Sequence, residues 1–591
     1  MTSELNVADI VWDLSPLYKG VNDPAVDQDI EKLKGAVVAF SSEYRGKIEE
    51  ISPLELARLM VSLEEIGQGA ARLGTFAYLN YATQTGSADA SANLQRIQEV
   101  GSSLEKEILF FRLDWARLSN EKAERHLQSP EIKKYRHYLE MARKYKPHQL
   151  SEIEERLLTE ISPVGTSSWH RLFGAILSQM KFGEKGRSEE EVLSDLYNPD
   201  REVRKAASDE LTEGLKGQLH ILTHIFNTIL ADHMISDKLR HYPAWISSRN
   251  LDNEIEDDSV TVLIAAAEER HDIPQRYYRL KKKFLGYDEL LDYDRYAPLP
   301  FTPAKLYTWE ECREIVLSSF ARFSPEMERI GKMFFDGKWL HATVTEGKVG
   351  GAFAHPATPD VHPFVLVNYT GNDRDIQTVA HELGHGIHQY LAGKSQGFFN
   401  SSTPLTTAET ASVFAEMLVF HSLLDTAKGK EARLSLLCNK IEGILATVFR
   451  QISMNRFEEA IHLERRERGE LSYERLSQLW METQEGMFGD SLTLTDNYRI
   501  WWSYIPHFIH SPGYVYAYAF GELLVLSLYK RYRDEGEPFV SKYMELLSSG
   551  GKASPPTLLS TFGIDLNNPD FWQEGISMID EMVKEAEGLV E

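Results

Sequence analysis

Two histidines and a glutamate in the segment HELGH, residues 381–385, have the spacing of a metal site on a helix. Residues i and i+4 of a helix lie one above the other, so His381 and His385 would both reach one ion at ~2.0–2.1 Å, the length of a Zn–N bond. Glu382 would project beside the ion, where its carboxylate can accept a proton from the attacking water. The segment therefore predicts hydrolysis assisted by a bound metal ion.

A third ligand is expected downstream, because a catalytic zinc site has three protein ligands and one open position. The segment TTAETASVFAEML, residues 406–418, offers Glu409, although a helical glutamate is more often solvated. We expect Glu416, two turns further along the same helical face, to orient a ligand imidazole. His388 lies on the metal face of the first helix, but a fourth protein ligand would close the open position. We expect His388 to line the cleft or to form a structural hydrogen bond.

The stretch before the metal helix is expected to position it. The run Phe364–Tyr369 is rich in Val and aromatic residues and has turn residues on both sides, which predicts a strand. Asp373 or Asp375 would cap the helix that follows. The order of strand, polar turn and helix places HELGH beside an extended segment.

A second extended piece is expected in EGKVGGAFAH, residues 346–355, where glycines allow a turn and a close approach of another backbone. This piece, or the strand Phe364–Tyr369, could pair with an extended peptide through backbone amides. We therefore assign substrate binding to Gly351 and Ala352. Recognition of a peptide main chain predicts loose side-chain specificity.

Long helices are expected to dominate the rest of the chain. Residues 89–127 contain no proline and repeat apolar side chains at helical spacing, and a second helical region is expected to open at Asn198 and Pro199. The turn at Phe182–Ser188 is the best candidate for a domain border. We therefore expect an N-terminal helical lobe, residues 1–185, and a catalytic domain, residues 186–591.

The charge of the chain disfavours nucleic acids and anionic membranes as partners. Its 591 residues include 89 acidic and 64 basic residues, a formal net charge of -25, which repels phosphate groups. An acidic excess is also common in soluble proteins, where it serves solubility. No stretch approaches the ~20 apolar residues of a membrane-spanning helix.

The cysteine content and the N-terminus indicate a reducing compartment. Two cysteines in a chain of this length cannot form a disulfide framework or a thiolate metal cluster. The N-terminal residues MTSELNVADIVWDLSPLY lack a basic start followed by an apolar run, so we expect no secretory signal. We therefore expect a cytoplasmic protein.

The metal motif and its surroundings resemble a known family. HELGHGIH followed by ETASVFAE resembles the thimet oligopeptidase family (M3) of zinc metallopeptidases, in its oligoendopeptidase F branch. WDLSPLY, GAFAHP, FVLVNYTGNDRDIQTVAHELGH and YIPHFIHSPGYVYAYAFGEL resemble further landmarks of that branch, in the expected order. Together they span almost the whole chain, which makes the resemblance more specific than the five-residue motif.

The resemblance implies a function for each residue of the metal motif. His381, His385 and Glu409 would bind one Zn²⁺ per chain, and Glu382 would act as the general base. The family fold would be mostly α, a large two-lobed helical body with a small β-sheet beside the metal helix and a deep substrate channel. Such a channel admits short unstructured peptides and excludes folded proteins.

The resemblance also implies that a histidine and tyrosines near the C-terminus bind substrate and donate hydrogen bonds to the oxyanion. The candidates in this chain are Tyr504, His507, His510, Tyr514 and Tyr518. We choose His507 and Tyr514 as the catalytic pair, and expect Tyr518 to lie on the same helical face as Tyr514. Tyr504, His510 and Tyr518 are assigned to substrate binding.

The sequence therefore predicts a zinc metalloendopeptidase that hydrolyses short unstructured oligopeptides. Two alternatives stay open: a metal-dependent carboxypeptidase of related helical fold, and a catalytically silent peptide-binding protein. Cobalt or manganese could replace zinc, because affinity order and availability both matter. The oligomeric state is left open.

Overall fold

The computed structural model describes residues 5–300 and 306–590. Residues 1–4, the start of the N-terminal stretch in which we expect no secretory signal, lie outside the described residues. The chain divides into two compact units, each assembled from three segments. Unit 1 comprises Met1–Gln149, Ala304–Asp425 and Arg531–Gly563, and unit 2 comprises Leu150–Pro303, Thr426–Lys530 and Ile564–Glu591. The predicted border between residues 185 and 186 stays a prediction.

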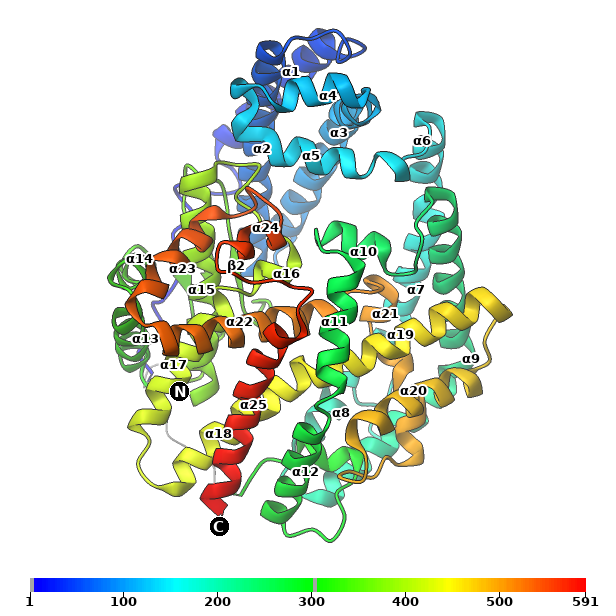
Figure 1. Ribbon diagram of the computed structural model, residues 1–591, viewed down its shortest axis with the longest axis vertical. Coiled ribbons are helices and arrows are strands. Elements are labelled where there is room, and N and C mark those ends of the chain that lie inside the picture. The colour runs from blue at the N-terminus through cyan, green and yellow to red at the C-terminus, as the bar shows by residue number, and fades with distance from the viewer. Residues whose placement is uncertain (1–4, 301–305, 591) are drawn as a thin grey trace. The chain divides into compact units, whose positions relative to one another are not determined.

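Helices form most of unit 1 (Figure 1). Its first segment contains α1 (Pro24–Tyr44), α2 (Pro53–Ala82), α3 (Ala88–Arg117), α4 (Asn120–Leu127), η1 (Pro130–Tyr135), α5 (Arg136–Lys144) and η2 (Lys146–His148). Its other segments contain α13 (Trp309–Phe323), α14 (Pro325–Asp336), α15 (Asp373–Gln396), α16 (Leu405–Ala408), α17 (Ser412–Thr426), α23 (Glu537–Ser549) and α24 (Pro555–Ser560). The expected helix over residues 89–127 is two helices, because Ser119 accepts a hydrogen bond from the N–H of Lys122 and caps α4.

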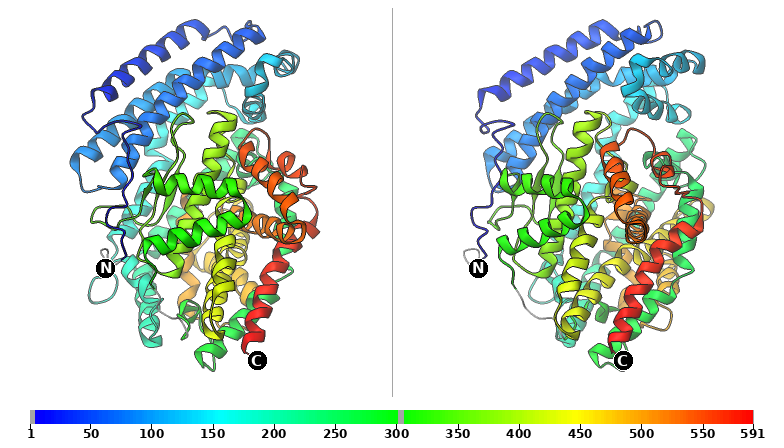
Figure 2. Two further views of the ribbon diagram at one scale, coloured as in Figure 1. Left: turned by 90° about the vertical axis from the view of Figure 1, so that its left-hand side faces the viewer. Right: turned by 60° about the vertical axis from the view of Figure 1, so that its left-hand side comes forward.

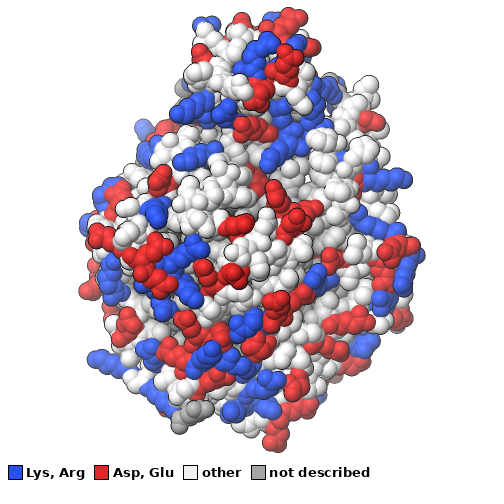
Figure 3. All heavy atoms as spheres, viewed as in Figure 1, with Lys and Arg blue, Asp and Glu red and all other residues white. Residues whose placement is uncertain are grey.

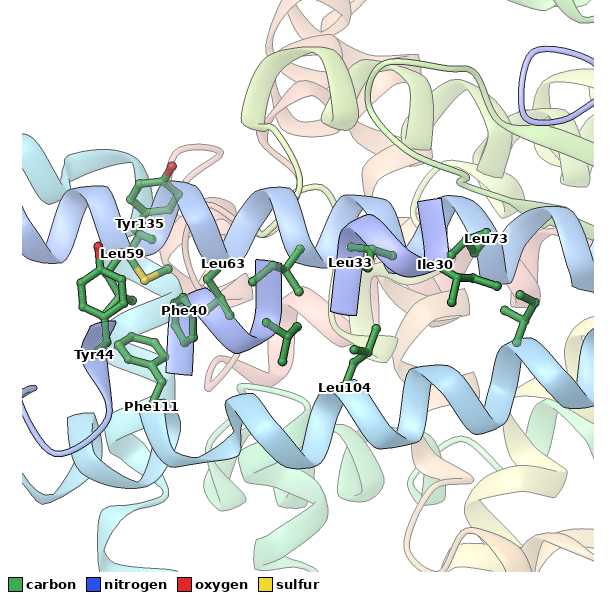
Figure 4. Close-up of a cluster of buried hydrophobic side chains, with 14 of the residues drawn as sticks. Ile30, Leu33, Phe40, Tyr44, Leu59, Leu63, Leu73, Leu104, Phe111 and Tyr135 are labelled. Carbon is green, nitrogen blue, oxygen red and sulfur yellow. The ribbon is translucent and has the colours of Figure 1, made fainter. Parts of the chain in front are cut away.

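The N-terminal helices of unit 1 pack around a shared apolar core (Figure 4). Ile30 and Leu33 of α1, Leu63 of α2 and Leu104 of α3 all belong to this core. The apolar positions recur every three or four residues, so one face of each helix is removed from water. Hydrophobic burial on these faces holds the N-terminal part of unit 1 together.

A small sheet in unit 1 precedes the metal helix. Its order is β1-β3-β2, with β1 (Leu340–His341) parallel and β2 (Phe353–His355) antiparallel to the central β3 (Phe364–Leu366). The indole of Trp12 packs against Phe353 and Phe364, at ring-centroid distances of 6.4 and 6.0 Å. The N-terminal segment therefore supports this sheet. Figure 2 shows α13 and α14 as a side-by-side pair, and both helices also contact α15.

Unit 2 is also helical. Its first segment contains α6 (Glu152–Ile161), η3 (Ser162–Val164), α7 (Thr166–Gln179), α8 (Glu189–Asp195), α9 (Arg201–Arg240), α10 (Ser247–Asp252), α11 (Asp257–Glu268), α12 (Asp272–Leu285) and η4 (Asp292–Tyr296). The rest contains α18 (Lys430–Thr447), α19 (Phe449–Arg468), α20 (Tyr473–Phe488), η5 (Asp496–Tyr504), α21 (His507–His510), α22 (Tyr516–Glu535), which continues into unit 1, and α25 (Pro569–Val590). The terminal helix α25 lies against α11 and α18 (Figure 1).

The start of α9 differs from the expectation at Asn198 and Pro199. Asp200 is the N-cap and accepts a hydrogen bond from the N–H of Glu202, so the helix begins at Arg201. The side chain of Asn198 instead accepts from the N–H of Asp200 and closes a turn before the helix. The predicted turn after Phe182 is present, with a bridge between Phe182 and Arg187.

The expected fold class is confirmed, because the described residues form helices around one small three-stranded sheet. Basic and acidic side chains are interspersed on the face shown in Figure 3. Within residues 5–300 and 306–590, no helix combines the length and apolar character needed to cross a membrane. The predicted two-lobed body and channel stay predictions.

Candidate metal centre

Helix α15 begins at a cap that fixes the start of the metal-binding segment. The side chain of Asn372 accepts a hydrogen bond from the N–H of Asp375 at 3.0 Å. The carboxylate of Asp375 accepts in turn from the N–H groups of Thr370 and Gly371, at 2.6 and 2.7 Å. The expectation of Asp373 or Asp375 as the cap is therefore wrong. Asn372 is the N-cap, and Asp375 is the reciprocal acceptor of the capping box.

The ligand atoms of His381, His385 and Glu409 lie within 4.8 Å of one another. Nε2 of each histidine lies 3.3 Å from Oε2 of Glu409. Two ligand atoms bound tetrahedrally at ~2.05 Å to one ion lie ~3.3 Å apart, so these pairs have the spacing that zinc requires. Two imidazole nitrogens and one carboxylate oxygen also match the donor set of a catalytic zinc site.

Glu409 lies between two helices. Helix α16 ends at Ala408, with Glu409 as its C-cap, and α17 begins at Ser412. The expectation that Glu409 and Glu416 lie on one helical face is wrong, because the chain turns at residues 409–411. This turn lets Glu409 approach Nε2 of His381, while Oε2 of Glu416 lies 3.3 Å from Nδ1 of the same ring.

The buried hydroxyl of Ser412 orients the third donor. Its Oγ donates a 2.6 Å hydrogen bond to Oε2 of Glu409. This bond, added to the contacts with the two imidazoles, limits the rotation of the carboxylate and keeps its oxygen near both rings. Sequence reasoning missed this residue, because a serine beside a helix start carries no metal-specific signal.

The glycine of HELGH lets the two donor segments come together. A Cβ at Gly384 would lie 2.5 Å from the carbonyl oxygen of Ala411 and 2.6 Å from Cα of Ser412. Both atoms belong to backbone, so any larger residue would push α15 away from the turn that carries Glu409. Sequence reasoning also missed this role. The available signal was a glycine inside a helical pattern, where it costs ~1 kcal/mol relative to alanine and needs a packing reason.

The donor group favours positive charge at its centre. Burial disfavours the imidazolium of His381, but the carboxylates of Glu409 and Glu416 outweigh burial and raise its pKa to about 10. Burial disfavours the charged form of Glu409, but His381 and His385 hold its pKa well below the usual range. A metal cation bound between these groups would take the place of the proton that the carboxylates otherwise favour on His381.

The two remaining site candidates on this helix, Glu382 and His388, differ in their surroundings. Glu382 is buried, and its burial raises the pKa of its carboxyl although both histidines oppose this. A carboxyl with a raised pKa is suited to accepting and then releasing a proton near neutral pH. His388 is buried and is not part of the donor group. Burial, and then the charge of His385, lower the pKa of His388 to about 4, so its imidazole is neutral.

Only one of the two extended segments has an open edge among the described strands. The central strand β3 is paired on both sides, so it has no edge left for a peptide. Strand β2 pairs with β3 on one side and directly follows Gly351 and Ala352. The amide of Asn368 donates to the carbonyl of Gly351 at 2.9 Å, which anchors this turn. The strand β3 is shorter than the predicted Phe364–Tyr369, and its residues Phe364–Leu366 leave no edge for a peptide. No described strand pairs with the outer edge of β2, where the side chain of Gln389 contacts the carbonyl of Ala354 at 3.4 Å.

The predicted histidine and tyrosines lie together in unit 2. Nε2 of His507 lies 3.1 Å from the hydroxyl of Tyr518. The ring of Tyr514 lies 4.8 Å from that of Tyr518 and stacks parallel to His507 at 6.2 Å. Tyr514 precedes α22, which begins at Tyr516, so the shared face arises from a turn before the helix.

Tyr504 and His510 have different neighbours. His510 is exposed and packs edge-on against His170 of α7, at 5.0 Å between ring centroids. Tyr504 ends η5, and burial raises the pKa of its hydroxyl. Tyr504 is therefore a neutral hydrogen-bonding group.

Comparison with known proteins identifies the family. The model described as Peptidase family M3 matches residues 195–578, and one described as Oligopeptidase F matches residues 114–182. The chain belongs to peptidase family M3. The predicted resemblance is thereby confirmed, and this M3 chain is a peptidase of a metal-dependent family with a candidate His-His-Glu site.

Named relatives and solved structures agree with this membership. Oligopeptidase PepF of Bacillus subtilis is 28% identical over 100% of this chain and 88% of its own length. An oligoendopeptidase F homolog of Borreliella burgdorferi is 27% identical over 95% of each chain. A solved structure from Chlamydophila abortus covers 98% of both chains with a TM-score of 0.86 at 25% identity. Oligoendopeptidase-F of Enterococcus faecium has a TM-score of 0.72 at 21% identity and covers 95% of this chain and 98% of its own, which shows the shared fold.

Proposed function

We propose that this M3 peptidase is a zinc metalloendopeptidase that hydrolyses short unstructured oligopeptides. The observation that carries the proposal is the convergence of His381, His385 and Glu409, with Glu382 beside them on the same helix. The names of the relatives, oligopeptidase and oligoendopeptidase, support the substrate class. The cytoplasmic location predicted from composition stays a prediction.

His381, His385 and Glu409 would hold the zinc ion, and Glu416 would hold the ring of His381 through Nδ1. Zinc bound at this site would polarise the scissile carbonyl and lower the pKa of a water toward ~7. Glu382 would accept the proton of the attacking water and pass it to the leaving amine. Its burial keeps the proton on the protein between these two steps.

The chain's other candidate residues would hold the substrate. We assign backbone pairing to the edge of β2 and to the turn at Gly351 and Ala352, because no described strand pairs with this edge. We assign oxyanion stabilisation to His507 and Tyr514, with Tyr518 as the partner that orients His507. The assignment to the oxyanion is supported by the family resemblance.

The proposal is tested with a peptide blocked at both ends and a Glu382→Gln variant. Wild type loaded with zinc should cut the blocked peptide at an internal bond, read by mass spectrometry. Glu382→Gln should keep zinc, measured by elemental analysis, and lose ~10²–10⁴-fold in kcat. Full activity of the variant would defeat the mechanism, and failure to cut the blocked peptide would favour the carboxypeptidase alternative. Chelation followed by zinc, cobalt or manganese distinguishes the metals by the activity that each restores.

A further inference from the structure

Unit 2 contains two neighbouring arginines that no described carboxylate pairs with. Arg295 lies in η4 and Arg450 in the first turn of α19. Arg295 donates to the hydroxyls of Tyr498 and Tyr296, at 3.0 and 2.7 Å. Arg450 also hydrogen-bonds Tyr296. Two guanidinium groups that are always charged therefore share phenol hydroxyls, and although burial opposes this, their charge lowers the pKa of Tyr296.

The charge of this arginine pair is poorly compensated. Nε of both side chains is buried without a hydrogen-bond partner among the described residues. Asp292 is the carboxyl that interacts electrostatically with Arg295, but burial raises its pKa and its Oδ1 accepts from the N–H of Thr495 instead. Buried cations without an anion are costly, so a bound anion would lower the free energy of this region.

Other arginines of unit 2 show the compensation that this pair lacks. Arg204 is fully buried and lies 2.9 Å from a carboxylate oxygen of Asp294. Arg456, on the same helix as Arg450, contacts Glu268 at 2.8 Å and Glu459 at 2.7 Å. Arg204 also has a buried Nε without a partner among the described residues, so the difference between Arg204 and the pair of Arg295 and Arg450 is the carboxylate that Arg204 contacts.

The pair lies beside the histidine and tyrosine cluster assigned to substrate: Arg295 donates to Tyr498 of η5, which ends at Tyr504, and Tyr296, Tyr504 and Tyr518 pack against one buried apolar cluster. Burial, and then the charge of Arg450, lower the pKa of His507. Arg450 likewise opposes the burial that raises the pKa of Tyr504. Arg450 is half-buried whereas Arg295 is buried, so Arg450 is the member that a ligand can reach. Arg295 lies behind it and shares Tyr296.

We propose that Arg450, supported by Arg295 and Tyr296, binds a carboxylate of the peptide substrate. The carboxylate would be the C-terminus of the peptide or an Asp or Glu side chain. The planar guanidinium matches a carboxylate in two parallel hydrogen bonds, and partial burial strengthens them. This inference rests on the proposed function. It specifies that the preferred substrates carry a carboxylate that contacts Arg450.

The test measures binding, so that it does not depend on turnover. Fluorescence anisotropy gives Kd for labelled peptides on zinc-loaded Glu382→Gln protein. One pair of peptides differs only in a free or amidated C-terminus, and a second, amidated pair differs only in Glu or Gln. The pair that shows a difference identifies the source of the carboxylate. Tighter binding of the charged member by on the order of tenfold to a hundredfold is expected for a charge-assisted contact.

Adding Arg450→Gln should abolish this preference, while Kd for the uncharged peptides changes little. Arg456→Gln is the matched control, because it removes a paired arginine from the same helix and should leave the preference intact. Arg450→Lys keeps the positive charge but loses the planar guanidinium with its two parallel donors. It should retain part of the preference for the charged peptide. Circular dichroism and Tm show whether each variant is folded. If Arg450→Gln is unfolded, the readout is the salt dependence of the preference in protein that keeps Arg450: added salt should weaken the preference.

Equal Kd values for charged and uncharged peptides in the Arg450 protein would overturn the inference, as would a preference that survives Arg450→Gln in folded protein. Neither result bears on the proposed function, which fails if zinc-loaded wild type does not cut the peptide blocked at both ends or if Glu382→Gln keeps full activity. Cleavage without a carboxylate preference therefore rejects the arginine subsite alone. A carboxylate preference without cleavage rejects the peptidase mechanism alone.

Discussion

The metal centre of unit 1 and the histidine, tyrosine and arginine cluster of unit 2 are assembled in different ways. The metal centre takes its donors and their partners from residues 381–416, with opposite charges in contact. The cluster of unit 2 draws on three stretches of chain, at Arg295, at Arg450 and at residues 504–518, and its cations face phenols. In the first region each charged donor has a partner of opposite charge within the protein. In the second region the two arginines have no carboxylate partner among the described residues.

This difference in charge pairing suits the two regions to different ligands, a cation and an anion. The proposed metal centre, in which opposite charges compensate one another, would hold a cation throughout the reaction. The cluster of unit 2, in which arginines meet phenols and not carboxylates, would receive an anion that arrives and leaves with the substrate. Variants in the two regions should therefore change different measurements.

Among the variants that distinguish the two regions, Tyr514→Phe should give the largest effect, a fall in kcat. If Tyr514 is the proposed oxyanion donor, its removal should lower kcat by ~10²–10³-fold, while the zinc content stays that of wild type. Stopped-flow or steady-state kinetics and elemental analysis measure the two quantities. Loss of zinc together with kcat would show that the two regions are not separable. Tyr516→Phe is the control, because Tyr516 is fully buried and its hydroxyl accepts from Asn253.

Glu416→Gln should act on the metal centre instead. It weakens the hold on Nδ1 of His381, so zinc affinity should fall by ~10–100-fold. Competition with a chromophoric chelator measures this affinity. Activity at saturating zinc should recover most of its wild-type value, and an unchanged affinity would reject the positioning role of Glu416.

Gly384→Ala tests whether close packing assembles the donors. The added Cβ meets the backbone of Ala411 and Ser412, so stability should fall by ~1–3 kcal/mol and zinc affinity with it. Gly74→Ala in α2 is the matched control, because its Cβ meets nothing within 4 Å and should stabilise by ~0.4–1 kcal/mol. Denaturant unfolding of both variants gives the comparison. Equal effects at the two glycines would contradict the packing argument.

Ser412→Ala should give the smallest change. It removes one hydrogen bond to Glu409, worth ~0.5–1.5 kcal/mol, so zinc affinity should fall several-fold. The same chelator competition measures it. A fall as large as that of Glu416→Gln would mean that the hydroxyl does more than orient the carboxylate.

Local sequence predicted those features that depend on short-range geometry. Helical spacing was enough to pair His381 with His385, and the run of β-branched and aromatic residues located β3. Caps were placed one to three residues away from their true positions at both α9 and α15. Several polar side chains near each helix start can accept the same N–H groups, and only the backbone path selects among them.

The sequence by itself determined the helical character, the two imidazoles of α15 and, through family resemblance, the set of donors. Only the tertiary structure decided that the chain turns between Glu409 and Ser412, that β2 and not β3 has an edge with which no described strand pairs, and that Arg450 lies beside Arg295. Helical periodicity acts over a few residues. A close contact at Gly384, a sheet order and an unpaired charge depend on segments that meet only after folding, so no local pattern encodes them.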